Sequence, residues 1–107
     1  MTDVPKVVRD GKVAVLVSPG FGAGWYSWNE EQGPECLFNP GIVALLEQGV
    51  PAELVQASAE SRWPEGYWGG ARDLKVEWVP VGKAFRVIEY DGSEYLEFSE
   101  GVEWIVA

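Results

Sequence analysis

The chain of 107 residues predicts a single globular domain spanning residues 1–107, because this length leaves no room for a second core. Its 47% hydrophobic content places it outside the disordered class, and its formal net charge of −9 argues against binding exposed duplex nucleic acid, which needs clustered Lys and Arg. The chain has no His and a single Cys, which excludes Ser–His–Asp and Cys–His catalysis and any disulfide within the chain.

The N-terminal part predicts one central strand. Residues 1–12 form a short arm with a turn at Asp10-Gly11. The segment 12–17 is a continuous, mostly β-branched run, which is typical of a strand buried on both faces. Pro19 cannot donate to a ladder and ends this strand, and we expect a loop from there to about residue 38.

The middle of the chain predicts one or two helices. In residues 39–49, Asn39 is a good N-cap, Pro40 occupies the first helical position and Gly49 is placed to end the helix. Apolar residues within it recur at i, i+3 and i+4, which gives it one buried face. A weaker helical pattern covers about residues 51–61, where serine lowers the helix propensity.

The C-terminal part predicts short antiparallel strands. Residues 74–78 alternate strictly between apolar and charged, and strands at 84–90 and 93–98 flank a tight Asp91-Gly92 hairpin. A last strand is expected at 102–106. Strands at intervals of roughly ten residues are typical of an antiparallel meander.

These elements together predict an α+β fold. We expect a twisted, mostly antiparallel sheet of about five strands, with one or two helices on one face and the first strand in the middle. An SH3-like small barrel formed by the second half of the chain is the alternative.

The segment 18–29 carries three glycines and four aromatic residues. It is not a dinucleotide-binding loop, because the sixth position counted from Gly20 is Trp25 where that fingerprint requires glycine. A Walker loop would need Gly-Lys at the same point, which is also absent. Aromatic rings beside flexible backbone suit stacking on a flat ligand, and they equally suit a turn that caps the core.

A second segment, 62–73, repeats this chemistry with glycines, three large aromatic residues and two arginines. Arginine can bind phosphate or carboxylate through two parallel hydrogen bonds, or it can pair with surface acids. If the two segments meet, they form an aromatic cleft with the arginines at its rim. The predicted ligand-binding residues are Phe21, Trp25, Tyr26, Trp28, Arg62, Tyr67, Trp68 and Arg72.

The acidic residues predict no catalytic or metal site. Glu30, Glu31 and Glu35 could bind a hard cation, but they lack the Asp-rich spacing of a calcium loop. At the acidic C-terminal end, Glu94 and Glu97 have opposite parity in a strand and therefore cannot share a face. This pattern favours a solvated edge protected by charge over a mimic of DNA.

The runs Ser-Pro-Gly-Phe-Gly-Ala-Gly-Trp (18–25), Ser-Trp-Asn (27–29) and Glu-Tyr-Asp-Gly-Ser-Glu (89–94) resemble short uncharacterised proteins encoded by tailed bacteriophages. The resemblance covers most of the chain and carries no known activity. It implies a small accessory protein in the cytoplasm of an infected bacterium. Phage proteins of this size often bind and neutralise a host protein or a nucleotide immune signal.

The sequence therefore predicts a non-enzymatic, cytoplasmic protein that binds a small flat or anionic ligand, such as a nucleotide signal, as an anti-defence sponge. Such a sponge would form a homo-oligomer with sites at subunit borders. No cofactor is expected. No membrane partner is expected either, since no apolar run approaches the length of a membrane span and no signal peptide begins the chain. The alternatives are a protein-interaction module that inhibits a host protein and a hydrolase that uses carboxylates and a metal.

Overall fold

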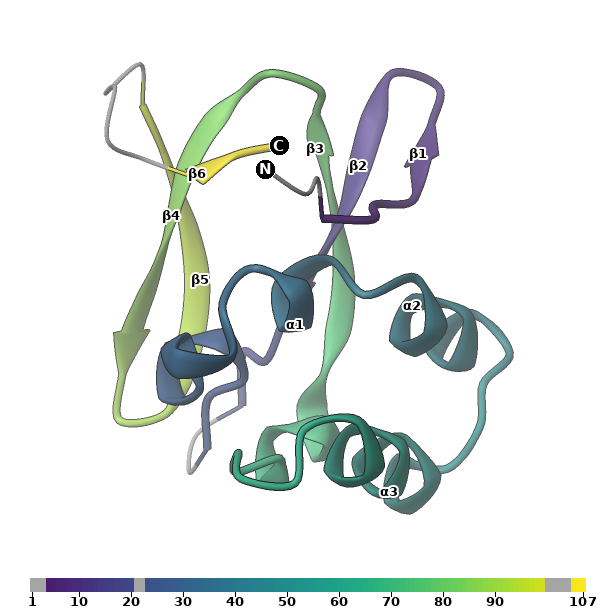
Figure 1. Ribbon diagram of the computed structural model, residues 1–107. Coiled ribbons are helices and arrows are strands. Elements are labelled where there is room, and N and C mark those ends of the chain that lie inside the picture. The colour runs from purple at the N-terminus through teal and green to yellow at the C-terminus, as the bar shows by residue number, and fades with distance from the viewer. Residues whose placement is uncertain (1–3, 21–22, 100–104) are drawn as a thin grey trace.

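The computed structural model, which describes residues 4–20, 23–99 and 105–107, is an α+β fold with two antiparallel three-stranded sheets (Figure 1). The first sheet has the order β1-β2-β3 and the second the order β5-β4-β6. The strands are β1 (Val8–Arg9), β2 (Lys12–Val17), β3 (Lys75–Pro80), β4 (Ala84–Tyr90), β5 (Ser93–Ser99) and β6 (Ile105–Val106).

Among the described residues, three α-helices and three short 3₁₀ helices lie in the connection between β2 and β3. The α-helices are α1 (Glu35–Phe38), α2 (Pro40–Glu47) and α3 (Ala52–Arg62). The 3₁₀ helices are η1 (Tyr26–Trp28), η2 (Glu30–Gln32) and η3 (Gly69–Asp73).

Strand β2 is buried on both faces, as its apolar run predicts. Ala14 and Leu16 face one core, which they share with residues of α2 and α3. The alternate valines face a second core, which includes Phe38 of α1 and Phe85 of β4. The rings of these two phenylalanines meet edge to face with their centroids 6.2 Å apart, so α1 packs at the junction of the two sheets.

The predicted turn at Asp10-Gly11 and the predicted hairpin at Asp91-Gly92 are both confirmed. Asp10 and Gly11 have φ values of 50° and 75°, and Asp91 and Gly92 have 52° and 87°. Two successive positive φ values match the right-handed twist of the flanking strands, and Asp-Gly adopts them at low cost. The strand registers follow directly, with Arg9 opposite Lys12 and Tyr90 opposite Ser93.

Both predicted helices are confirmed. The side chain of Asn39 accepts a hydrogen bond from the backbone N–H of Ile42 at 3.0 Å, which caps α2. Gly49, just beyond the end of α2, has a φ of 72°, which glycine reaches without strain. Helix α3 covers the second, weaker pattern.

The expectation of one sheet with about five strands is wrong in detail. The described residues form six strands in two sheets, and they form no closed SH3-like barrel. The physical reason lies at the start of β4, where Ala84 and Phe85 are paired with β5 on one edge and with β6 on the other, so this end of the strand cannot also pair with β3. The segment 18–38, expected as a loop, contains η1, η2 and α1. Of the strand expected at 102–106, residues 102–104 lie outside the described residues.

The cap of α2 gives a first prediction. Asn39→Ala removes the acceptor for the N–H of Ile42 and should lower the free energy of unfolding by about 1 kcal/mol in urea denaturation. Asn39→Asp keeps an acceptor oxygen and should retain most of the stability. Equal losses in the two variants would contradict this account of the cap.

Candidate functional site

The two aromatic–glycine segments lie against each other. The hydroxyl of Ser18 donates to the carbonyl oxygen of Gly70 at 2.8 Å. A Cβ atom on Gly70 would lie 2.5 Å from the carbonyl oxygen of Gly24, so the contact requires glycine at this point. The rings of Trp25 and Trp68 meet with their centroids 4.7 Å apart. The segments that the sequence analysis singled out therefore form one structural unit.

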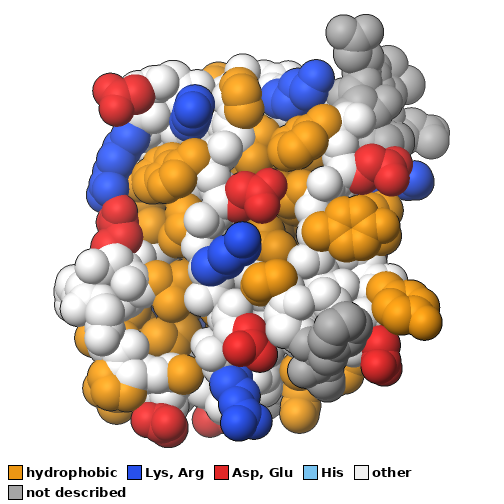
Figure 2. Space-filling model, turned by 180° about the vertical axis from the view of Figure 1, so that it is seen from behind, with side chains coloured by type: hydrophobic (Ala, Val, Ile, Leu, Met, Phe, Trp, Pro, Cys, Tyr) orange, Lys and Arg blue, Asp and Glu red, His pale blue; other side chains and the backbone are white. Residues whose placement is uncertain are grey.

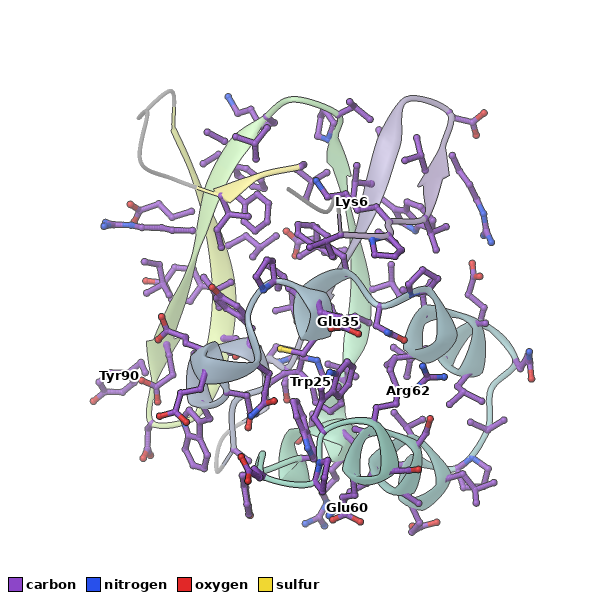
Figure 3. The ribbon with its side chains drawn as sticks, viewed as in Figure 1. Lys6, Trp25, Glu35, Glu60, Arg62 and Tyr90 are labelled. Carbon is purple, nitrogen blue, oxygen red and sulfur yellow. The ribbon has the colours of Figure 1, made fainter. Side chains whose placement is uncertain are left out.

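Most of the aromatic rings in this unit belong to the core. Trp25 is 0% exposed, lies near the centre of the molecule and donates from its indole N–H to the carbonyl of Cys36 at 2.7 Å (Figure 3). Trp68 is also buried, its ring meets that of Trp63 at a tilt of 43°, and its indole N–H donates to the carbonyl of Trp63 at 2.8 Å. With their ring faces and N–H groups occupied inside the protein, Trp25 and Trp68 have structural roles.

A buried carboxylate holds the first segment in place. Glu94 of β5 is 1% exposed, and its Oε1 accepts the backbone N–H of Ser18 at 3.0 Å. Its Oε2 accepts the N–H of Trp25 at 2.7 Å and both the N–H and the hydroxyl of Ser27 at 2.8 and 2.7 Å. Four donors thus converge on one carboxylate, and such charge-assisted hydrogen bonds are the strong ones. The expectation that the acidic end is only a solvated edge is wrong for Glu94, which faces inward.

The thiol of Cys36 is buried in the core. Burial, with a further contribution from the charge of Glu94, raises the pKa of Cys36 to about 12. The sulfur lies 3.4 Å from the carbonyl oxygen of Gly33, to which it donates. A thiol that stays protonated is a weak nucleophile, so Cys36 acts as a small core residue.

Asn29 joins the two segments on the surface side. This side chain is buried, and its amide NH₂ donates to the carbonyl oxygens of Trp25 and Tyr67 at 2.6 and 2.7 Å. Its amide oxygen accepts the backbone N–H of Tyr67 at 2.6 Å. Because Asn29 follows Trp28 directly, these three hydrogen bonds fix the positions of the chain at Trp28 and at Tyr67 together.

A surface cleft of about 360 Å³ lies where these two residues emerge. It is lined by residues 27–32 on one side and 65–67 on the other. Trp28 is 43% exposed and Tyr67 is 56% exposed, and their ring centroids are 5.6 Å apart with planes tilted by 35°. We call this feature the Trp28–Tyr67 cleft, and it is the candidate functional site.

The described lining of the cleft carries three glutamates, Glu30, Glu31 and Glu65, and no Lys or Arg. A further acid, Glu89 of β4, accepts the indole N–H of Trp28 at 3.3 Å. The cleft therefore presents two aromatic rings in an acidic setting.

The remaining predicted site residues lie elsewhere. Tyr26 is half-buried against both cores, and burial, with a further contribution from the charge of Glu30, raises its pKa. Arg62 lies between α2 and α3, where it donates to the hydroxyl of Ser58 at 3.3 Å (Figure 3). Arg72 is exposed on η3, and neither arginine is among the described residues that line the cleft. Phe21 lies outside the described residues.

A second hollow of about 280 Å³ lies between α2 and β3 and includes Trp78. Its charged residues are of both signs, Glu47 and Lys75, and Arg9 already forms an ion pair with Glu47. Figure 2 shows the side of the molecule opposite to that of Figure 1, where hydrophobic side chains are interspersed with charged ones. The hollow therefore does not combine aromatic rings with charges of a single sign, as the Trp28–Tyr67 cleft does.

Sequence reasoning missed Asn29 and Glu94, which position the cleft, and Glu65, which lines it. The sequence did contain a signal for Glu94. In a strand with alternating side chains, Glu94 lies on the opposite face from Glu97 and on the same face as the apolar residue Leu96. No local pattern marks Asn29, whose partner Tyr67 is distant in the sequence.

Within the described residues, no group of three or more His, Cys, Asp or Glu side chains is arranged to hold a metal ion. None of the described helices has both the length and the apolar character needed to cross a membrane. No protein-family model matches the chain, and searches of curated proteins and of solved structures found no match.

Glu94 gives a second prediction. In Glu94→Gln one carboxylate oxygen becomes an NH₂ group, which faces at least one of the buried donors, so the free energy of unfolding should fall by about 1–3 kcal/mol. The matched control is Glu97→Gln on the same strand, where the exposed ion pair with Arg86 should contribute less than about 1 kcal/mol. Urea denaturation measures both, and similar losses would contradict the proposed role of Glu94.

Cys36 gives a third prediction. With a pKa of about 12, roughly one thiol in ten thousand is ionised at pH 8, and a thiol-specific reagent should label the native protein only as fast as it unfolds. The control is a Cys36→Ser, Ser61→Cys double variant, whose thiol lies at an exposed position of α3 and should react at once. Rapid labelling of native Cys36 would show that the core opens at this point.

Proposed function

We propose that the protein is a non-enzymatic binding domain and that its ligand contacts Trp28 and Tyr67 in the cleft between them. The observation that carries the proposal is the hydrogen bonding of Asn29, which fixes two exposed aromatic residues side by side. The other tryptophans of this unit, including Trp25, have their ring faces inside the core.

Preorganisation supports this choice of site. Large exposed aromatic residues that are already held in place lose little conformational freedom on binding, and such residues dominate binding energies at interfaces. Ser27 is fixed by Glu94 on one side of Trp28, and Asn29 is fixed on the other. The backbone around Trp28 is therefore rigid before any ligand arrives.

The chemistry of the cleft favours binding over catalysis. The chain has no His to serve as a general base, and the thiol of Cys36 is buried and protonated. The carboxylates Glu30, Glu31 and Glu65 line an open surface cleft with two aromatic rings. The phage origin and the anti-defence role stay predictions from the sequence resemblance.

The fourth prediction tests binding at this cleft. In protein labelled with 5-fluorotryptophan, each tryptophan gives a fluorine NMR signal, and the Trp28→Phe variant assigns the one from Trp28. Titration with a panel of nucleotides, arginine and lysine amides and short peptides should shift the Trp28 signal saturably with one class, while the signal of buried Trp25 stays constant.

Two further variants localise that response. Tyr67→Ala should abolish the shift, because it removes half of the ring pair. Tyr90→Ala removes a more exposed ring at the edge of the molecule, outside the cleft, and should leave the shift unchanged (Figure 3). If no class of probe moves the Trp28 signal, the proposed function is wrong.

A further inference from the structure

We infer that the Trp28–Tyr67 cleft binds a positively charged side chain, a guanidinium or ammonium group, presented by a basic segment of a partner protein. The inference rests on the proposed function, because it assigns a ligand class to the same cleft. The sign of the charge, the aromatic pair and a comparable arrangement elsewhere in this chain support it.

The charges around the cleft favour a cation. Glu30, Glu31 and Glu65 line it, and its described lining contains no Lys or Arg. An anionic ligand would be repelled by these carboxylates, since like charges disfavour one another in a partly desolvated site. Arg62 and Arg72, which the sequence analysis assigned to neutralise an anion, lie outside the described lining. At longer range, the net charge of −9 also attracts cations and steers them toward the protein.

The aromatic pair supplies the second half of cation recognition. A guanidinium or ammonium group over an indole or phenol ring is attracted by the ring quadrupole, and tryptophan is the best partner. Trp28 and Tyr67 both line the cleft that contains the three glutamates. A cation seated there would contact a ring and a carboxylate at the same time.

The chain binds its own arginine in this way. The guanidinium of Arg9 lies 5.4 Å from the ring centroid of Trp78 and also forms an ion pair with Glu47. The ammonium of Lys6 lies 4.6 Å from the ring centroid of Phe38. The hollow beside Trp78 and Glu47 is thus supplied with a cation from within the chain. The Trp28–Tyr67 cleft has the same kinds of group and no cation in its described lining.

A partner protein is favoured over a free small cation. A volume of about 360 Å³ is at the lower end for ligand pockets and suits one long side chain. A lone amino acid would have to offset the loss of its translational and rotational freedom with these few contacts. A basic side chain on a larger surface adds contacts around the rim, where Glu89 lies beside Trp28.

The test compares four probes on the fluorotryptophan-labelled protein: a short peptide with two arginines, the same peptide with citrulline in place of arginine, arginine amide, and ATP. Citrulline keeps the shape of arginine and removes its charge. The arginine peptide should shift the Trp28 signal and should bind at least about tenfold more tightly than the citrulline peptide. Its affinity should fall as salt is added.

Charge variants separate the cleft from the general acidity of the protein. Glu30→Gln and Glu65→Gln should each weaken binding of the arginine peptide about two- to fivefold. Glu60→Gln on α3, outside the cleft, removes the same charge and should change the affinity little. Arg62→Ala and Arg72→Ala should not weaken binding.

The outcomes distinguish the two proposals. If ATP shifts the Trp28 signal and the arginine peptide does not, the cleft is a binding site but the inferred cation is wrong. Equal affinities for the arginine and citrulline peptides would also overturn it. If arginine amide alone binds as tightly as the peptide, the partner is a small molecule. If no probe moves Trp28, the proposed function fails with the inference.

Discussion

The carboxylate of Glu94 is the constraint on which the rest of the structure depends. It lies inside the protein, and its described partners are three backbone N–H groups and one hydroxyl rather than a cation. Burying an ionised group is costly, and here the cost is offset by four charge-assisted hydrogen bonds. The N–H of Glu94 also donates to the carbonyl of Ser18 at 2.8 Å, so β5 is tied to the end of β2 by both its backbone and its side chain.

The elements that sequence reasoning predicted well are those with local causes. Residues 12–17 and 84–90 have the predicted strand bounds, and Asn39 and Gly49 frame the predicted helix, because each depends on neighbours within a few residues. The division into two sheets depends on β4 pairing with β5 on one edge and with the distant β6 on the other. No local pattern encodes that choice, which is why one sheet was expected.

The candidate site could be predicted in part, for a related reason. Both aromatic–glycine segments do lie together, but composition does not say which rings face inward. That selection is made by Gly70, which lets the backbones approach closely enough for Trp25 and Trp68 to meet in the core. Trp28 and Tyr67 flank these buried rings in the sequence and are the ones left on the surface.

The core and the cleft are consequently parts of one hydrogen-bonded system. Glu94 binds the backbone and the hydroxyl of Ser27, the next residue is Trp28, and Asn29 then binds both Trp25 and Tyr67. Separating Trp28 from Tyr67 would require breaking the hydrogen bonds of Asn29 to Tyr67, next to a residue, Ser27, that Glu94 ties to β5. Such coupling restrains the backbone at the cleft, so under the proposed function we expect recognition to depend on the fit and charge of the ligand rather than on a loop that closes over it.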